Sequence, residues 1–364
     1  MKILLPFQQF NGYDFYSKKI FGGIERFCKH VYDCYDVEVL QHPSIDIWKQ
    51  DKTIKKSVQQ QIKIKAKEID ADIILCNWGD SLQIGAGMVD SEIPIMHICH
   101  GMNPMQSSLI AYKRLKTHNH SVFMVSEYQN NFYIGMDNRL NIGYKIDGIV
   151  EPTYLCGDKP KIIKDPEFDC ITIGRCDKDK NPFLTKILLH DTNLKSLVMS
   201  NKIESGVYLN RKYYDKHKNW DGVLWDLEHN DVLKNLSKGR SYFMTWADEC
   251  FPITGLEALS RGLFLIINSR MSEDRGPVKR QNYRYPLHGG EGWPVKKSHY
   301  VNIMKGSKEE LTNAINSSRN IDRQEIQDMT WDKYTEKRWK SILNSAIDKT
   351  IENFKSNRGV FLYD

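Results

Sequence analysis

The segment DECFPITGLEALSRG, residues 248–262, places two carboxylates on either side of a glycine-containing turn. Glu249 follows an apolar run that predicts a strand, and TGL at 254–256 opens a helix-like run whose first turns include Glu257. The N–H groups at the start of a helix, together with the positive end of its dipole, suit a phosphate. Gly255 lets the main chain approach such a ligand without a Cβ in the way. The segment therefore predicts a phosphate seat between acids that can bind sugar hydroxyls, although acids are also common at helix starts that bind nothing.

Short apolar runs alternate with longer amphipathic stretches over the rest of the chain, which is typical of parallel sheets covered by helices. One series runs from Met1 to Pro152, and a second begins with FDCITIG at 168–174. Residues 151–168 between them are polar and contain three prolines, which predicts a linker. The pattern predicts an α/β protein with two lobes that face each other across a cleft. Sheets of this kind bind ligands at the carboxyl ends of their strands.

The composition excludes several other classes of protein. With 364 residues, 40% of them hydrophobic and 27% charged, the chain is long enough for two domains and too apolar to be disordered. No run approaches the roughly 18 apolar residues of a membrane-spanning helix, and the start MKILLPFQQFNGYDF turns polar too early for a signal peptide. We therefore expect a cytoplasmic protein without a stable membrane anchor. The net charge of +6 is compatible with a polyanionic partner.

Glycines and cations follow the first apolar run of each series. Gly22 and Gly23 come after the run at the N-terminus, directly before an amphipathic stretch. In the second series, IGR at 173–175 is followed by Lys180. An arginine offers a planar fork for phosphate oxygens and a lysine offers a point charge. The alternative interpretation of CDKDKNP, residues 176–182, is a solvated polar loop.

Together these motifs resemble the nucleotide-sugar-dependent glycosyltransferases of the GT-B fold, in particular the retaining group with an E-x7-E signature. The resemblance covers nearly the whole chain. It implies two Rossmann-like domains facing each other across a cleft: an acceptor-binding domain over 1–155 and a nucleotide-sugar-binding domain over 165–325. It also implies that the helices of residues 326–364 cross back and pack on the N-terminal domain.

The resemblance further implies a role for each motif residue. Arg175 and Lys180 would neutralise the diphosphate, where negative charge develops as the sugar–phosphate bond breaks. Glu249 would hold the transferred sugar, and Glu257 would hold the ribose of the nucleotide. Main-chain groups and glycines would complete the donor site: Gly22, Gly23, Thr254, Gly255 and Leu256.

A histidine at the end of a strand in the first series is a further candidate. His97 and His100 lie in MHICHG, and strand alternation puts them on opposite faces. GT-B enzymes often have a histidine near this point that contacts sugar or acceptor, and Gly101 after His100 makes His100 the better match; Asp80 is a weaker candidate. The expected catalytic set is Glu249, Arg175, Lys180 and His100. By the resemblance, a UDP-sugar is the expected donor. No metal ion is expected, because the acidic pair at 177–179 lies beside the cations rather than at a convincing strand end.

Within this family the chain looks most like the bacteriophage DNA glycosyltransferases, which attach a sugar to hydroxymethylcytosine. Basic residues that alternate with aromatics in RGPVKRQNYRYP, residues 275–286, suit an extended polyanion with bases to stack on. The expected partner is therefore double-stranded DNA with a modified cytosine, bound by a monomeric enzyme. The expected contact residues are Arg275, Lys279, Arg280, Tyr283 and Arg284.

Two alternatives stay open. A transferase acting on a lipid-linked or capsular glycan is supported by the basic amphipathic segment 53–69, which an anionic membrane could bind. An ordinary outer helix of the first lobe is the favoured interpretation of that segment, because its apolar face lacks Trp, Phe and Leu. The second alternative is a protein that binds a nucleotide or a sugar without turnover. Binding to DNA but not to anionic vesicles separates the two enzymes, and sugar transfer separates both from the binding protein.

Overall fold

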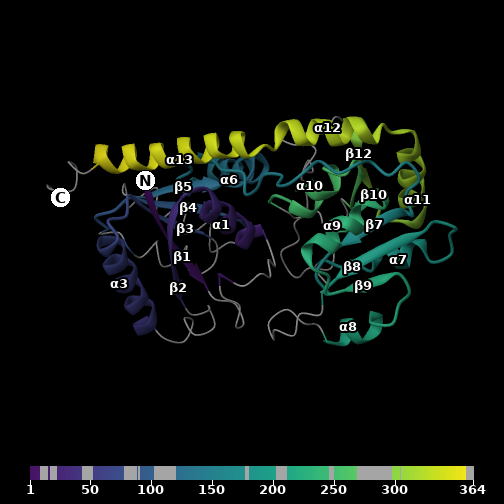
Figure 1. The fold of residues 1–364 in the computed structure, drawn as a ribbon, viewed down its shortest axis with the longest axis horizontal. Helices are drawn as coiled ribbons and strands as arrows, with labels where there is room; N and C mark the ends of the chain where they lie inside the picture. Colours follow the sequence, from purple (N-terminus) through teal and green to yellow (C-terminus); the bar gives the residue numbers. More distant parts are fainter. Residues whose placement is uncertain are drawn as a thin grey trace. The chain divides into compact units, whose positions relative to one another are not determined.

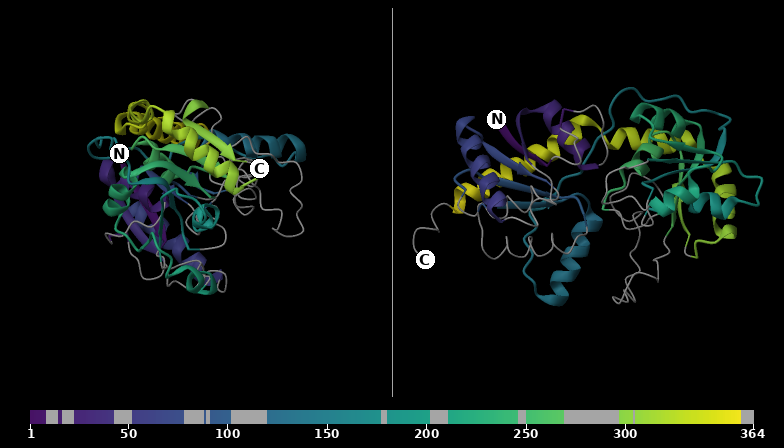
Figure 2. Two further views of the ribbon diagram at one scale, coloured as in Figure 1. Left: turned by 90° about the vertical axis from the view of Figure 1, so that its right-hand side faces the viewer. Right: turned by 90° about the horizontal axis from the view of Figure 1, so that it is seen from below.

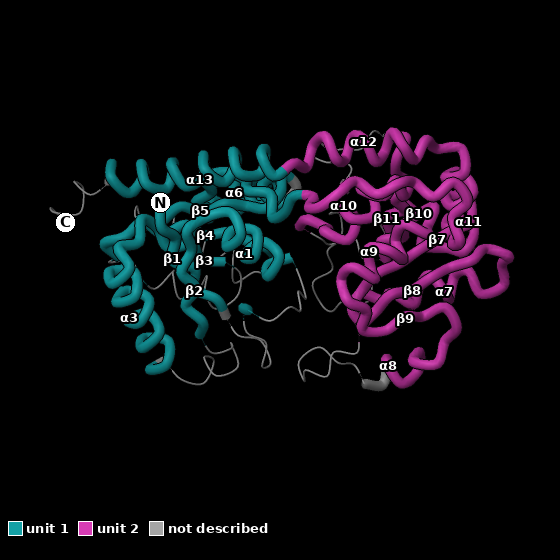
Figure 3. Tube along the Cα trace, viewed as in Figure 1, with its two compact units in different colours: residues 1–154, 336–364 teal, residues 155–335 magenta. Residues whose placement is uncertain are grey.

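The computed structural model divides the chain into two compact units. Unit 1 comprises residues 1–154 and 336–364, and unit 2 comprises residues 155–335 (Figure 3). The structure describes residues 1–8, 15–16, 23–42, 52–77, 88, 91–101, 120–176, 180–201, 211–245, 250–268, 297–303 and 305–357. Compared with the expected domain ranges, the division places residues 326–335 in unit 2 rather than with the final helix.

The described residues of unit 1 form a six-stranded parallel sheet with the order β2-β1-β3-β4-β5-β6 (Figure 1). The apolar runs expected as strands supply its members: β1 (Lys2–Gln8), β2 (Asp36–His42), β3 (Ile73–Cys76), β4 (Ile95–Cys99), β5 (His120–Met124) and β6 (Gly148–Ile149). The helices of this unit are α1 (Gly23–Cys34), α3 (Lys52–Glu68), α6 (Glu127–Leu140) and α13 (Glu336–Asn357).

Strand alternation assigns the helices of unit 1 to two faces of its sheet. Val122 and Met124 of β5 pack with Tyr133 of α6, whereas Ser121 of the same strand accepts a hydrogen bond from Asn353 of α13 at 3.0 Å. Because neighbouring side chains of a strand point to opposite faces, α6 and α13 cover opposite faces of the sheet. The end of the chain thus completes the layer structure of the domain that begins it (Figure 1).

Helix α3 uses its apolar side chains inside unit 1. Val58, Ile62 and Ala66 are buried in one cluster with strand residues such as Ile74. Two lysines of the helix form ion pairs, Lys65 with Glu38 at 3.2 Å and Lys67 with Glu92 at 2.8 Å. The helix is therefore an outer helix of the sheet, as one of the two interpretations of segment 53–69 proposed.

The described residues of unit 2 form a second six-stranded parallel sheet, with the order β12-β11-β10-β7-β8-β9. Figure 2 shows the ribbon of this unit, in teal to yellow-green, from two further sides. Its strands are β7 (Phe168–Ile173), β8 (Ser196–Ser200), β9 (Val223–Trp225), β10 (Gly239–Met244), β11 (Phe264–Asn268) and β12 (Tyr300–Ile303). Its helices are α7 (Leu184–Leu189), α8 (Arg211–His217), α9 (His229–Ser237), α10 (Ile253–Leu259), α11 (Lys308–Ser317) and α12 (Arg323–Lys333), with short 3₁₀ turns at Lys297–His299 and Ser318–Asn320.

Two clusters cover the faces of this second sheet. One contains Tyr242 and Met244 of β10 with residues of α9, α10 and α12, and the other contains Phe243 of β10 with residues of α7 and α11. The alternation along β10 thus produces three layers, helix–sheet–helix. The run GVYLN predicts a strand at residues 206–210, which lie outside the described residues. The sequence did not predict the strand β9 at Val223–Trp225.

A buried arginine joins the amino ends of three strands in unit 2. Arg323, the first residue of α12, donates from Nε to the carbonyl oxygen of Gly262 at 3.0 Å and from Nη2 to that of Gly239 at 2.8 Å. Its Nη1 donates to Ile163, in the segment that leads to β7, at 2.6 Å. Gly262 has a φ of +71°, and a Cβ at this position would collide with the main-chain oxygen of Arg323. Burial lowers the pKa of the guanidinium only to about 10, so it stays charged at neutral pH.

Replacing Arg323 with Met keeps an apolar stem but removes every donor. Because the buried carbonyl oxygens of Gly239 and Gly262 then lose a partner, we expect the free energy of unfolding of unit 2 to fall by about 3 kcal/mol. Urea unfolding followed by tryptophan fluorescence measures the change. The control Arg319→Met, which removes an exposed guanidinium paired with Asp169, should change it by less than about 0.5 kcal/mol. Equal stability of Arg323→Met and the wild type contradicts this role.

Candidate functional site

The carboxyl edge of the unit 2 sheet contains the point where the strand order reverses. From β7 the chain proceeds outward through β8 and β9, then returns to the other side of β7 as β10. Parallel sheets bind ligands outside the carboxyl ends of the strands at such a switch point. Arg175 follows β7 and Thr245 follows β10, so both lie at this edge.

The turn after β7 is fixed by main-chain bonds on both sides. Gly174 donates its N–H to the carbonyl oxygen of Met199 at 3.1 Å, and its own carbonyl accepts from the Ser200 hydroxyl at 2.8 Å. A Cβ on Gly174 would lie 3.3 Å from the Cβ of Pro182, so the turn folds closely back on itself. The carbonyl oxygen of Lys180 accepts a hydrogen bond from the Thr245 hydroxyl. The two loops that flank the switch point are thus linked.

A small cavity of about 30 Å³ opens between these loops and the start of α10. Its lining residues are Ile173, Lys180, Tyr242, Met244, Thr245, Pro252 and Thr254. The Tyr242 hydroxyl lies 2.9 Å from Thr254 Oγ1 and 3.3 Å from the carbonyl oxygen of Ile173. Burial, first, and the charge of Glu257 raise the pKa of this phenol, so Tyr242 stays neutral. The cavity brings together Lys180 and Thr254, two residues that the sequence predicted for the donor site.

Helix α10 starts at this cavity without a capping side chain. Pro252 occupies its N-cap position, in extended conformation, and makes no side-chain capping bond. An α-helix leaves its first N–H groups without partners in the helix, so the amides at Thr254 and Gly255 depend on a partner from outside it. Gly255 and Leu256 of this helix are buried, and Ala258 and Leu259 pack in one cluster with Tyr242 and Met244 of β10. Packing on the sheet therefore holds the helix whose amides are the expected phosphate contacts.

Glu257 lies one turn further along α10 and is almost completely buried. Its side chain is 7% exposed, and its Oε1 lies 3.4 Å from Nε2 of His229, the first residue of α9. The main-chain oxygen of Glu257 accepts hydrogen bonds from Ser260 Oγ at 2.7 Å and from Arg261 Nη1 at 3.1 Å. A carboxylate at this depth needs a donor or a cation beside it, and His229 is such a group.

In unit 1, His100 follows β4 at the carboxyl edge of the sheet. Its Nε2 lies 3.2 Å from Asn77 Oδ1, and Asn77 donates from Nδ2 to the Cys28 sulfur at 3.4 Å. Because Oδ1 can only accept, Nε2 carries the proton and Nδ1 is an acceptor. Burial lowers the pKa of His100 from 6.5 to about 3, so the ring is neutral at physiological pH. The ring of Phe27 packs edge-on against it, with centroids 5.4 Å apart.

Four other candidates of unit 1 have different outcomes. His97 is fully buried, and its Nε2 lies 2.8 Å from Nδ1 of His120 in a stacked pair, so it belongs to the core. Gly23 is the first residue of α1. Gly22 lies outside the described residues, as does Asp80.

The remaining predicted positions also lie outside the described residues. These are Glu249 of the acidic pair and the expected DNA contacts Arg275, Lys279, Arg280, Tyr283 and Arg284. In the part of the chain that is described, no cluster of three or more His, Cys, Asp or Glu residues could hold a metal ion. No helix among those residues is both long enough and apolar enough to cross a membrane.

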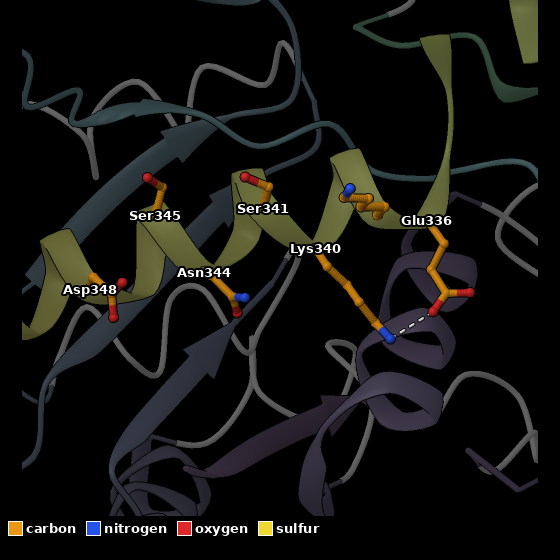
Figure 4. Close-up of a pocket in the computed structure, with 7 residues that line it drawn as sticks. Glu336, Lys340, Ser341, Asn344, Ser345 and Asp348 are labelled. Atoms are coloured by element: carbon orange, nitrogen blue, oxygen red, sulfur yellow. Dashed lines mark ion pairs between the residues drawn. The ribbon is translucent and has the colours of Figure 1, made fainter. Parts of the chain in front are cut away.

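A larger hollow of about 720 Å³ lies along α13 in unit 1 (Figure 4). Its lining residues are Glu336, Lys337, Lys340, Ser341, Asn344, Ser345 and Asp348. Lys340 is paired with Glu336 at 2.6 Å, and Asn344 Oδ1 accepts from the Tyr35 hydroxyl at 2.9 Å. The hollow carries both signs of charge, whereas the predicted phosphate-binding groups lie in unit 2.

Comparisons with known proteins place this arrangement in a structural class. No protein-family model matches the chain, and no curated protein matches its sequence. The lipopolysaccharide outer core galactosyltransferase WaaB has a TM-score of 0.59 at 14% identity, over 96% of this chain and 99% of that one. HepE of Anabaena, solved with UDP and glucose, has a TM-score of 0.65 at 13% identity, over 96% and 99%. Sucrose-phosphate synthase of Thermosynechococcus elongatus has a TM-score of 0.63 at 10% identity, over 99% and 100%.

The chain has the GT-B fold. The expectation of two Rossmann-like parallel α/β domains is thereby confirmed, with all described strands of each sheet paired in parallel. At these levels of identity the similarity concerns the fold.

Three residues of the unit 2 site were not found from the sequence. Tyr242 lies inside the apolar run SYFMTW, which predicts only a strand, and Thr245 lies near the end of that run. His229 lies at a helix start 28 positions before Glu257. Alternation along β10 was a usable signal, because it puts Tyr242 and Met244 on one face. Nothing local in the sequence pairs His229 with Glu257.

The depressed pKa of His100 predicts an acid-sensitive unit 1. The unfolded chain binds a proton near pH 6.5 and the native site only near pH 3, so the contribution of His100 to stability is complete above pH 6.5 and declines as the pH falls toward 3. Between pH 7 and pH 5 the loss should reach about 2 kcal/mol. His100→Gln, which keeps a donor for Asn77, should flatten this pH dependence in thermal unfolding. His190→Gln, at an exposed histidine of unit 2, should leave it unchanged; the same slope in both variants contradicts the assignment.

Proposed function

We propose that the protein is a glycosyltransferase that transfers a sugar from a nucleoside diphosphate sugar to an acceptor hydroxyl. One observation carries the proposal: at the switch point of the unit 2 sheet, Lys180 and the uncapped start of α10 line one cavity, with Arg175 on the adjoining turn and Glu257 one turn away. Cations, helix amides and a buried carboxylate match the parts of a nucleoside diphosphate. The complex of HepE with UDP and glucose supports the choice of a UDP-sugar.

The proposed roles divide the donor among these groups. Arg175 and Lys180 neutralise the diphosphate, and the amides of Thr254, Gly255 and Leu256 bind its terminal phosphate. Glu257 accepts hydrogen bonds from the ribose. Glu249 holds the transferred sugar, with Gly22 and Gly23 over the donor and His100 as an acceptor for a hydroxyl group.

The reaction needs stabilisation of the leaving group more than it needs a base. The bond between the sugar's anomeric carbon and the diphosphate oxygen breaks, its electron pair stays on that oxygen, and the cations oppose the charge that develops there. The acceptor oxygen forms the new bond on the same face, and its proton passes to the departing phosphate oxygen. The configuration is then retained, in line with the E-x7-E resemblance. Arg175 and Lys180 supply the positive charge that a metal ion supplies in other transferases.

For the acceptor we propose hydroxymethylated cytosine in double-stranded DNA, in the cytoplasm of a bacterial host. Its support is the net charge of +6, the basic and aromatic segment 275–286, and the resemblance to phage DNA glycosyltransferases. An enzyme of this kind reaches the hydroxymethyl group in the major groove or flips the nucleotide out of the helix.

A lipid-linked or capsular glycan is the competing acceptor. The similarity in fold to WaaB, a lipopolysaccharide galactosyltransferase by its name, favours it. Membrane docking through α3 is not part of this alternative, because Val58, Ile62 and Ala66 are buried in the core of unit 1. A protein that binds the donor without turnover makes the same contacts and transfers no sugar.

Variants at the donor site test the proposal directly. Arg175→Ala and Glu257→Ala each remove a charged partner of UDP, so both should weaken UDP binding by about tenfold or more in isothermal titration calorimetry. Lys234→Ala removes a positive charge from the last turn of α9, away from the carboxyl edge of the sheet, and should leave the affinity unchanged. Full UDP affinity in both site variants contradicts the assigned roles.

The acceptor is tested by nucleotide release from UDP-sugars with three substrates in parallel: hydroxymethylcytosine DNA, cytosine DNA and a lipopolysaccharide core acceptor. We expect release only with hydroxymethylcytosine DNA, with a matching gain in mass of the modified nucleoside. Release with the core acceptor alone replaces DNA by a glycan. Tight UDP binding without release under any condition supports the binding protein.

A further inference from the structure

The imidazole of His229 lies beside the buried carboxylate of Glu257. The side chain of His229 is 38% exposed and that of Glu257 is 7% exposed, and Nε2 lies 3.4 Å from Oε1. His229 begins α9, which follows β9 at the carboxyl edge of the sheet, so its main chain is held by the first turn of a helix. The two residues come from neighbouring helices, and their contact depends on the packing of α9 against α10.

Tyr242, Arg261 and His229 lie near Glu257 and interact with it in different ways. Tyr242 faces it from β10, but the Tyr242 hydroxyl is engaged with Thr254 and the carbonyl oxygen of Ile173. Arg261 bonds to main-chain oxygens of Leu233 at 3.0 Å and of Glu257 itself at 3.1 Å. Among the described residues, His229 is a group whose side chain lies at the carboxylate oxygen Oε1 itself.

We infer that His229 is a positioning residue that fixes one carboxylate oxygen of Glu257, so that the other oxygen faces the ribose diol and the site selects ribonucleotides over deoxyribonucleotides. This inference rests on the proposed function, in which Glu257 binds the ribose. When one oxygen of a buried carboxylate is held in place, the other oxygen accepts a hydrogen bond from a hydroxyl group in only one geometry. A nucleotide without the 2′-hydroxyl gives that buried acceptor one hydrogen bond fewer than the ribonucleotide does, which lowers its affinity.

Selectivity of this kind distinguishes positioning from a merely structural role. Loss of packing around α9 weakens all nucleotides alike and leaves their ratio unchanged. Loss of the orientation of Glu257 removes the advantage of the ribonucleotide and so changes the ratio. A glutamine at position 229 restores a donor at a similar distance from the main chain, because its Nε2 mimics the Nε2 of the imidazole.

The test compares the dissociation constants of UDP and 2′-deoxy-UDP, measured by calorimetry, for the full chain and its variants. For the wild type we expect UDP to bind about tenfold more tightly than 2′-deoxy-UDP. In His229→Ala the ratio should fall to about threefold or less, and His229→Gln should recover most of it. The control Asn230→Ala changes the adjacent exposed residue of the same helix turn and should keep the wild-type ratio.

Glu257→Gln should lose the preference as His229→Ala does, and the double variant should lose no more than either single one, because both act on one interaction. A wild-type ratio in a folded His229→Ala protein overturns the inference and leaves the proposed function standing. A wild-type protein that binds neither UDP, ADP nor GDP overturns the proposed function itself. Thermal unfolding of each variant establishes that it is folded, and His229→Gln decides the outcome if His229→Ala is not.

Discussion

Parallel pairing of the strands is the constraint on which the other features of this protein depend. Because the described strands of each sheet run in one direction, every loop that leaves a strand at its carboxyl end emerges at the same edge. In unit 2 this places the turns after β7 and β10 and the start of α10 beside one another, although they are some 70 residues apart in the chain. Charged residues that are far apart in sequence therefore lie near one another at the point where the strand order reverses.

The two edges of the unit 2 sheet satisfy their polar groups in opposite ways. At the amino edge, the guanidinium of Arg323 donates hydrogen bonds to the carbonyl oxygens of Gly239, at the start of β10, and of Gly262, before β11. These carbonyl groups thus find their partners within the protein. At the carboxyl edge, α10 begins at Pro252 without a side-chain cap. In the proposed function, a phosphate of the nucleotide supplies the partner that this helix start lacks in its own side-chain cap.

The sequence predicted the elements with strong periodicity and the residues with a local motif. The strands around Ile74, Met96 and Phe243 were foreseeable because their apolar runs are bounded by polar turns, and Lys180 because it follows a strand that ends in glycine. The partners Tyr242 and His229 were not, because each gains its role from a neighbour on another element. The short strand β9 carries too few residues for alternation to reveal it.

His97 and His100, which strand alternation places on opposite faces of the sheet, have different partners in the structure. His97 lies within β4, and its buried imidazole stacks on that of His120, with Nε2 of His97 at 2.8 Å from Nδ1 of His120. His100 stands one position beyond the strand, where Asn77 fixes its tautomer and leaves Nδ1 as an acceptor. Its low pKa keeps that lone pair free of protons over the physiological range. A neutral acceptor at a strand end suits a sugar hydroxyl, whereas a charged imidazole would attract the diphosphate instead.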